Sequence, residues 1–460
     1  MACESLSSRI LELDACNLPD DLYRVAETCL LDLLGVAIAA GETSLAGIAR
    51  KFVLSQFPGD QALLFGEGSA SSIGSALYGG WLIDALDGHD GHVLTKGHAG
   101  VALLPALLAL PECGRLSGRR FLGELAIGYE VAIRAGISLH ASACDYHTSG
   151  AWNCLGVAAM AARLKQLNAD QLDHALGIAE FYGPRSQMMR CIDYPTMLKD
   201  GSGWGAMTGL SAVLLAQSGF TGAPALLLGE AAGADETVAS AWRNFGDQWH
   251  FRQTYFKRFP VCYWAQPAVE ATLSLMDQLT NPRDIDHIDI TTFHQAKRLH
   301  TTMPHNTEQA QYSLPWAVAC ALHGQTIDQH SVTTDLLNPD IQRLARTVTV
   351  TENETFNLAF PARRFARVTL CLNNGTELVS QDFEARGTPH QPLSESEMVG
   401  KFRQLSQPAI GPQSEAIIKT VKTLLNRPAS DLLNLLGPVP ATNHSRTATQ
   451  PLDTNHAPSS

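Results

Sequence analysis

The first half of the chain repeats its apolar positions with the period of an α-helix. Pro19-Asp20-Asp21 has the chemistry of a helix start, and apolar residues from Leu22 to Leu33 then recur on one side. Strict two-residue alternation is nearly absent before about Gln266. Further Ala- and Leu-rich stretches lie at 74–86, 101–110, 118–139, 150–164, 169–182 and 203–217. The pattern predicts an all-helical domain over 1–265, with helices that are apolar nearly all round and packed inside.

The pattern changes near Ile285. Residues 286–293 and 347–351 alternate like half-buried strands, and 367–372 and 377–380 flank the turn pair Asn374-Gly375. Helical stretches at 268–279 and 312–322 lie between these strands. The segment 266–393 is therefore predicted to form a smaller α+β domain.

The last part of the chain returns to helical patterning. Ser394 and Glu397 have the spacing of a capping box, and amphipathic stretches continue to about Leu436. From Ala441 onward the chain is rich in Thr, Asn, Pro and Ser and offers almost nothing to bury. We expect helices up to about Leu436 and a disordered tail over 441–460.

Length and charge limit the possible partners. The 460 residues fit two large domains, and a hydrophobic content of 45% with 17% charged residues argues against disorder for most of the chain. The net charge of −12 disfavours nucleic acids and anionic membranes, because binding to either depends on Lys and Arg. No apolar stretch is long enough to span a bilayer as a helix. We expect neither partner.

The cysteines and the N-terminus indicate the compartment. The ten cysteines include no CxxC pair, and residues 1–5 lack the basic and apolar regions of a signal peptide. We therefore expect free thiols and a cytoplasmic protein. The Gly-rich stretch 65–69 has neither the Lys-Ser or Lys-Thr of a P-loop nor the spacing of a dinucleotide fingerprint, so no nucleotide cofactor is expected.

One short segment concentrates titratable side chains beside an apolar run. Between Ala85 and Gly100 the chain carries two aspartates, three histidines and a lysine, and the apolar run 101–110 follows. Burial and neighbouring charges move a pKa toward the working pH, so this setting suits proton transfer. These side chains are Asp87, His89, Asp90, His92, Lys96 and His98. We expect an active site that includes this segment.

Three later segments extend the pattern. Tyr146-His147 opens the segment 146–153, Lys199 precedes a small-residue run at 203–207, and 256–260 reads Phe-Lys-Arg-Phe-Pro. In this order the motifs resemble the MmgE/PrpD family, over about residues 6–436. That family includes 2-methylcitrate dehydratase, cis-aconitate decarboxylase and iminodisuccinate epimerase.

The resemblance has consequences for both fold and site. It implies a large helical domain with a smaller α+β domain, in which 394–440 packs back on the first domain and completes it. It also implies a homodimer and an active site on the same segments, without a metal. The positions that match cis-aconitate decarboxylases are Asp87, His98 if one residue is inserted, His147 and Lys199. Two positions differ, because a Thr of those enzymes falls on Gly91 and a His falls on Gln266 or Cys262.

Abstraction of a proton next to a carboxylate needs a base, and cations or donors for the resulting charge. We expect Lys199 with either Tyr146 or His147 to act as the two bases of an epimerase, and His98 and Asp87 to complete the catalytic set. The expected substrate-binding residues are Asp90, Arg185, Arg190, Lys96 and Gln266. The substrate would be a small di- or tricarboxylate, such as an iminodisuccinate-like compound, and no cofactor is expected.

Other functions compete with the epimerase. A dehydratase of the 2-methylcitrate type or a cis-aconitate-type decarboxylase could use the same groups. A metal-dependent hydrolase could draw ligands from this same short span, although distant partner ligands are not evident in the sequence; the candidate ligands are Asp87, His89, Asp90, His92 and His98. The chain could also be a non-catalytic helical scaffold in which each of these residues has only a structural role.

Overall fold

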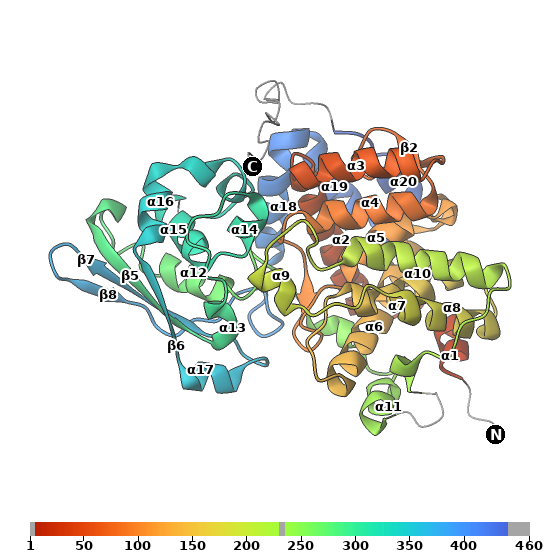
Figure 1. Cartoon of the computed structure of the whole chain (residues 1–460). Coiled ribbons are helices and arrows are strands. Elements are labelled where there is room, and N and C mark those ends of the chain that lie inside the picture. Colours follow the sequence, from red (N-terminus) through yellow and green to blue (C-terminus); the bar gives the residue numbers. More distant parts are fainter. Residues whose placement is uncertain (1–4, 230–234, 325, 440–460) are drawn as a thin grey trace, which may run out of the picture.

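The computed structural model describes residues 5–229, 235–324 and 326–439. A helical part forms one side of the molecule, and a part built on a four-stranded sheet forms the other (Figure 1). The predicted fold class, a large helical domain with a smaller α+β domain, is confirmed. The tail predicted to be disordered, 441–460, lies outside the described residues.

The helical part begins near the N-terminus and continues to about residue 255. Its helices are α1 (Leu6–Glu12), α2 (Asp20–Ala40), α3 (Ser44–Gln56), α4 (Ser72–Asp84), α5 (Gly100–Leu108), α6 (Gly118–Ser142), α7 (Gly150–Leu164), α8 (Ala169–Tyr182), α9 (Met189–Asp193), α10 (Ser202–Gln217) and α11 (Glu236–Trp242). Two antiparallel pairs of very short strands accompany them: β1 (Gln61–Ala62) with β2 (Ser69–Ala70), and β3 (Gly91–His92) with β4 (Thr254–Tyr255). Neither strand pair is evident in the sequence pattern.

The centre of the helical part is a close contact of α6, α7 and α10. Every residue of α7 is buried, as the all-round apolar pattern predicts. Glycines permit the close approach, since a Cβ on Gly156 of α7 would lie 2.5 Å from the carbonyl oxygen of Gly128 in α6. A Cβ on Gly209 of α10 would likewise collide with the backbone of α7. This packing fixes the N-terminal end of α7, which reaches the site described below.

The α+β part is a mixed sheet covered by helices. The strand order is β6-β5-β7-β8, with β5 parallel to β6 and antiparallel to β7, and β7 and β8 form the hairpin predicted from Asn374-Gly375. The strands are β5 (Ile285–Thr292), β6 (Val348–Glu352), β7 (Ala366–Leu372) and β8 (Glu377–Val379). The helices are α12 (Gln266–Leu273), α13 (His294–Lys297), α14 (Thr307–Gln311), α15 (Leu314–Gly324), α16 (Pro339–Arg346) and α17 (Glu354–Ala359). α12 packs on β7, and α15 packs on α12.

The last helices return to the first part of the fold. They are α18 (Glu395–Ile410), α19 (Gln413–Lys422) and α20 (Ala429–Leu433), and α18 packs along α2. The predicted capping box is present, with Ser394 and Glu397 exchanging side chain and backbone hydrogen bonds. A buried ion pair joins the two helices, because Nζ of Lys401 donates to Asp32 Oδ1 at 2.5 Å and to the Gly88 carbonyl at 2.6 Å.

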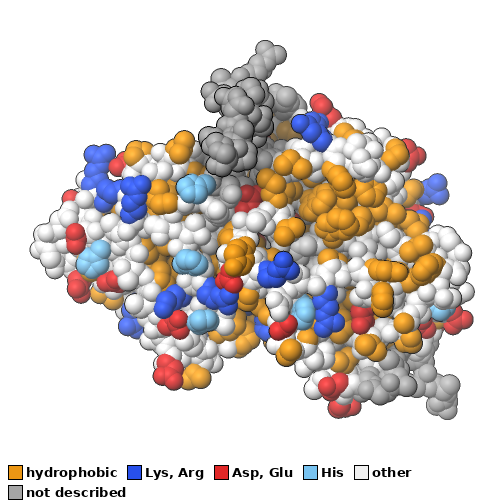
Figure 2. Space-filling view, in the orientation of Figure 1, with side chains coloured by type: hydrophobic (Ala, Val, Ile, Leu, Met, Phe, Trp, Pro, Cys, Tyr) orange, Lys and Arg blue, Asp and Glu red, His pale blue; other side chains and the backbone are white. Residues whose placement is uncertain are grey.

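Apolar side chains also gather on the surface of the helical part (Figure 2). Exposed members on α3 and α10 are Ile48, Phe52, Leu54, Trp204 and Leu215. A second copy of the chain could cover such a surface, and the homodimer stays a prediction. Among the described residues, no single helix is both long and apolar enough to cross a membrane, and α2 with α3 meets those criteria only as a pair bent by 92°.

Loss of the Lys401 ammonium should destabilise the protein strongly. Replacing Lys401→Met leaves the buried Asp32 carboxyl without its counter-charge, which should lower the free energy of unfolding by about 3–5 kcal/mol in denaturant titrations. The second change Asp32→Asn should recover part of this loss. Lys422→Met is the matched control, because that lysine pairs with Glu395 at the surface and should contribute no more than about 1 kcal/mol. Equal losses for the two lysines would contradict this account of how α18 is held.

Candidate active site

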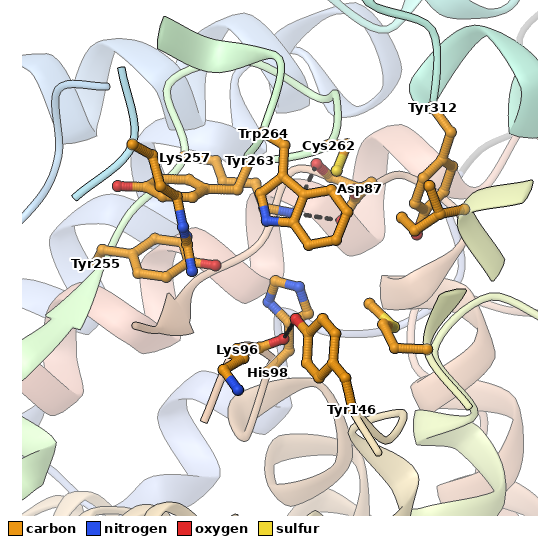
Figure 3. A pocket seen from close by; sticks show the side chains of 13 residues that line it. Asp87, Lys96, His98, Tyr146, Tyr255, Lys257, Cys262, Tyr263, Trp264 and Tyr312 are labelled. Atoms are coloured by element: carbon orange, nitrogen blue, oxygen red, sulfur yellow. Dashed lines mark hydrogen bonds and ion pairs between the residues drawn. The ribbon is translucent and has the colours of Figure 1, made fainter. Parts of the chain in front are cut away.

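A pocket lies where the helical part meets the α+β part. It is lined by Asp87, Lys96, His98, Tyr146, Met188, Ile192, Tyr255, Lys257, Cys262, Tyr263, Trp264, Tyr312 and Arg364. In Figure 3, Lys96, His98 and Tyr146 lie below the space between these side chains, and Tyr263 and Trp264 lie above it. The cavity between them is about 20 Å³, room for roughly one water molecule, so a ligand would bind only with movement of some lining side chains.

A buried ion pair between Asp87 and Lys257 forms one wall of the pocket. The pairing of β3 with β4 brings the loop after α4 beside the segment that carries Lys257. The lysine ammonium contacts Asp87 Oδ1 and also lies 3.2 Å from the Asp87 carbonyl oxygen. Burial raises the pKa of the Asp87 carboxyl, but the charge of Lys257 and other nearby positive groups outweighs it, and the pKa falls below its ordinary value. Asp87 is therefore an ionised anchor.

One ring nitrogen of His98 is engaged in a hydrogen bond to the backbone, and the other is free. Nδ1 lies 2.5 Å from the Asp90 carbonyl oxygen, which can only accept, so Nδ1 carries the proton and Nε2 is left with a free lone pair. The backbone of His98 is fixed by Ser149 at 2.8 Å and Asn153 at 3.2 Å, both near the start of α7. Burial, reinforced by the charge of Lys257, lowers the pKa of His98 to about 4. At neutral pH this residue is an uncharged imidazole that lines the pocket.

Lys199 lies close to the pocket but behind its wall. Gln311, the last residue of α14, accepts hydrogen bonds at Oε1 from the Lys199 ammonium and from the Asp87 backbone N–H, the latter at 2.8 Å. The ammonium also lies 5.4 Å from the ring centre of Tyr312, which does line the pocket. Burial lowers the pKa of Lys199, and the charge of Asp87 opposes this. Lys199 and Asp87 thus belong to one network.

Tyr146 and Lys96 act as a pair. The Tyr146 hydroxyl donates to the Lys96 carbonyl oxygen, and the Lys96 ammonium lies 5.1 Å from the centre of the Tyr146 ring. Burial raises the pKa of Tyr146 well above its ordinary value, so it is a poor base at neutral pH. Lys96 has a left-handed backbone with φ of 52°, as does Lys199 with φ of 50°. Such strain in a residue with a side chain is often found at functional sites.

Three predicted residues lie outside the pocket. His147 is partly exposed, and its Nε2 accepts a hydrogen bond from Nε of Arg185 at 3.3 Å. Arg185 and Arg190 are exposed, and Arg190 contacts Ser186 at 3.3 Å. None of the three lines the pocket. Their predicted roles in catalysis and substrate binding gain no support from their positions.

Two further predicted binding residues are occupied by the protein itself. The Gln266 amide donates to the carbonyl oxygens of Phe259 at 2.8 Å and Val261 at 3.1 Å, so it shapes the turn that follows Lys257. Asp90 accepts from the Tyr129 hydroxyl at 2.6 Å, and burial together with the charge of Asp32 raises the pKa of Asp90 to about 8. Neither residue lines the pocket, and Asp90 orients His98 through its carbonyl oxygen and not through its carboxyl group.

The metal alternative can be judged from the same geometry. Asp87, His89 and His98 each offer a ligand atom, and these atoms lie within 4.8 Å of one another. The Asp87 carboxylate already contacts the Lys257 ammonium, however. A divalent cation would have to displace Lys257 or share the carboxylate with it, which charge repulsion opposes.

Several lining residues were not among the predicted site residues. Lys257 falls in a motif noted in the sequence, but its pairing with Asp87 could not be inferred from 170 residues of separation. The aromatic lining, Tyr255, Tyr263, Trp264 and Tyr312, has no local signature of a site. Arg364 comes from the loop before β7 in the α+β part, and nothing in the sequence distinguishes it from its neighbour Arg363.

Comparisons with known proteins agree with the motifs. The MmgE/PrpD N-terminal domain matches residues 4–243, and the MmgE/PrpD C-terminal domain matches residues 259–427. The chain belongs to the MmgE/PrpD family. The two matched domains of this family correspond to the helical part and to the α+β part with the start of the returning helices.

Curated relatives in the MmgE/PrpD family cover most of the chain. A cis-aconitate decarboxylase from Aspergillus terreus is 23% identical over 436 residues, which is 85% of this chain and 86% of that protein. A cis-aconitate decarboxylase from Mus musculus is 23% identical over 427 residues, which is 87% of this chain and 86% of that protein. These likenesses support an enzyme of the lyase type over a non-catalytic scaffold.

The protonation state of His98 can be measured directly. We expect its imidazole to titrate near pH 4 in nuclear magnetic resonance of ring-labelled protein, with the proton on Nδ1 above that pH, because burial and Lys257 oppose a second proton. The variant His98→Gln assigns the signal. Titration near 6.5, or a mixture of both neutral tautomers, would contradict the described environment.

Proposed function

We propose that this chain is a cofactor-independent lyase that transfers a proton at a carbon next to a carboxylate of a small di- or tricarboxylate. The observation that carries the proposal is a pocket in which the uncharged imidazole of His98 shares the space with positive side chains that have no carboxylate partner. Lys96 and Arg364 line the pocket and form no ion pair among the residues that the structure describes.

The positive side chains suit a substrate with more than one carboxylate. Lys257 is neutralised by Asp87, so the excess positive charge comes from Lys96 and Arg364. Buried charges are normally paired, and anionic groups of a ligand would supply the missing partners. Hydroxyl donors near the reacting carboxylate, such as those of Tyr255 and Tyr312, would stabilise the negative charge that develops when the neighbouring carbon loses a proton or CO2.

His98 is the best-placed group for the proton transfer. Its Nε2 lone pair can accept a proton from carbon, and the Asp90 carbonyl then holds the resulting imidazolium through Nδ1. Returning that proton to carbon or to a leaving hydroxyl completes the cycle. Tyr312 and Tyr255, both with raised pKa values from burial, remain protonated and can donate hydrogen bonds.

In this proposal His98 replaces the residues first expected to act as bases. The epimerase hypothesis used Lys199 with Tyr146 or His147, but Lys199 lies behind the wall, Tyr146 donates to Lys96, and His147 faces outward. One well-placed imidazole fits a lyase more simply than a two-base epimerase. Epimerisation remains a separate outcome of the experiment below.

The relatives make cis-aconitate the first substrate to test. One of the two positions that differ from the decarboxylases is Gly91, where a Cβ would lie 2.5 Å from the Tyr255 hydroxyl. Tyr255 therefore brings a hydroxyl close to the place that a Thr would occupy. At the other difference, Cys262 lines the pocket and Gln266 does not, and burial raises the pKa of the Cys262 thiol to about 12.

The proposal is tested by following substrates in deuterated water. The purified protein is incubated with cis-aconitate and with a panel of hydroxy- and amino-substituted di- and tricarboxylates, and the products are followed by nuclear magnetic resonance. We expect turnover of at least one polycarboxylate in which a carbon next to a carboxylate either loses its hydrogen or gains solvent deuterium. Released CO2 indicates decarboxylation, loss of hydroxyl indicates dehydration, and inversion without loss indicates epimerisation.

The variant His98→Gln should lower the rate by about 10²–10⁴-fold, because it removes the proton carrier. His323→Gln is the control, since His323 is exposed on α15 and pairs with Asn338 at 3.3 Å. Turnover in which no carbon next to a carboxylate loses hydrogen or gains deuterium, or equal activity of the two histidine variants, would overturn the assignment.

A further inference from the structure

Arg364 is a buried cation without a counter-charge. Its side chain lines the pocket, the residue is only 5% exposed, and its Nε has no hydrogen-bond partner. The guanidinium lies 4.8 Å from the ring centre of Tyr263 and 5.7 Å from that of Phe360, so aromatic rings hold it in place. No carboxylate lies within ion-pair distance of it in the described part of the chain. A charge held in this way implies a partner that the protein does not supply.

Neighbouring arginines of the same segment behave differently. Arg363 is exposed and forms an ion pair with Glu384, and Arg367 is exposed and forms one with Asp382. Arg364 alone of these three turns inward, although all three belong to the loop and strand that lead into the sheet. Arg364 is thus the charged side chain that the α+β part contributes to the pocket. The other charged lining residues come from the helical part and from the segment after it that carries Lys257.

Lys96 is the second cation without a partner. It is half-buried and lines the same pocket as Arg364, and burial, followed by the charge of Arg364, lowers its pKa. The hydrogen bond from Tyr146 to its carbonyl oxygen holds the left-handed backbone from which Lys96 reaches the pocket. Two like charges placed together in a pocket are stabilised by an anion that contacts both.

We infer that Lys96 and Arg364 together form a subsite for a carboxylate of the substrate distinct from the one next to the reacting carbon. This inference rests on the proposed function in taking the ligand to be a small polycarboxylate. Arg364 would bind the carboxylate oxygens through its planar fork, and Lys96 would act as a point charge beside it. Because one cation belongs to each part of the fold, a bound carboxylate would also bridge the helical and α+β parts. The subsite makes Arg364 a residue that selects di- and tricarboxylates over monocarboxylates.

The subsite can be tested by binding alone, without turnover. The probes are propane-1,2,3-tricarboxylate, succinate and butyrate, and their affinities are measured by calorimetry for the whole protein. Arg364→Gln should lower the affinity for the two polycarboxylates by about 30-fold or more. The affinity for butyrate, which is weak, should change by no more than a few-fold. Arg364→Lys, which keeps the charge but loses the fork, should give an intermediate loss.

The matched control is Arg363→Gln, which removes an adjacent surface cation and should change none of the affinities. Lys96→Met should also lower the affinity for the polycarboxylates. The double variant with Arg364→Gln should lose less affinity than the product of the two single losses, because both residues bind the same carboxylate. The thermal midpoint without ligand should not fall in Arg364→Gln, since an unpaired buried charge is removed.

Three results would overturn the subsite: equal effects of Arg363→Gln and Arg364→Gln, equal weakening of butyrate and succinate, or no polycarboxylate binding to the unaltered protein. Failure of the proposed function is distinguishable from these outcomes. In that case polycarboxylates bind and their binding depends on Arg364, but no carbon next to a carboxylate loses hydrogen or gains deuterium.

Discussion

The ion pair of Asp87 with Lys257 is the contact on which the rest of the site depends. Both groups are almost fully buried, and removal of either would leave the other without its counter-charge. The pair fixes the loop after α4 against the link that leads into the α+β part. The same loop carries His98, and Gln311 ties its backbone to Lys199. Loss of this pair would therefore disturb the base, the network behind it and the contact between the two parts.

Charge balance in the pocket then determines what it can bind. Asp87 neutralises Lys257, which leaves Lys96 and Arg364 without carboxylate partners and His98 without charge. A protein with a net charge of −12 does not attract polycarboxylates through its overall field, so local cations must supply the attraction. The proposed chemistry and the proposed subsite both follow from this imbalance.

The sequence was informative where the signal is local. Helical periodicity located the buried helices, the Asn374-Gly375 pair located the hairpin, and the cluster of titratable residues between Asp87 and His98 located one wall of the pocket. Side-chain direction was not accessible in this way. His147 and Arg185 lie on a segment that reaches the pocket through Tyr146, yet they contact each other at the surface.

Residues that depend on distant partners escaped prediction for the same reason. Arg364 and Arg363 are adjacent and chemically identical, but Arg364 packs on the rings of Tyr263 and Phe360, whereas Arg363 pairs with Glu384 at the surface. Gln266 follows the Phe-Pro motif, but the carbonyl groups of the turn before it occupy its amide. A sequence pattern identifies residue types, whereas these roles depend on contacts between segments that are far apart in the chain.

A crystal structure with propane-1,2,3-tricarboxylate bound would test the central claim most directly. The account predicts one carboxylate between Lys96 and Arg364, and a carbon next to another carboxylate within van der Waals distance, about 3.5 Å, of Nε2 of His98. A ligand bound elsewhere, or a ligand in the pocket with Arg364 still unpaired, would contradict it.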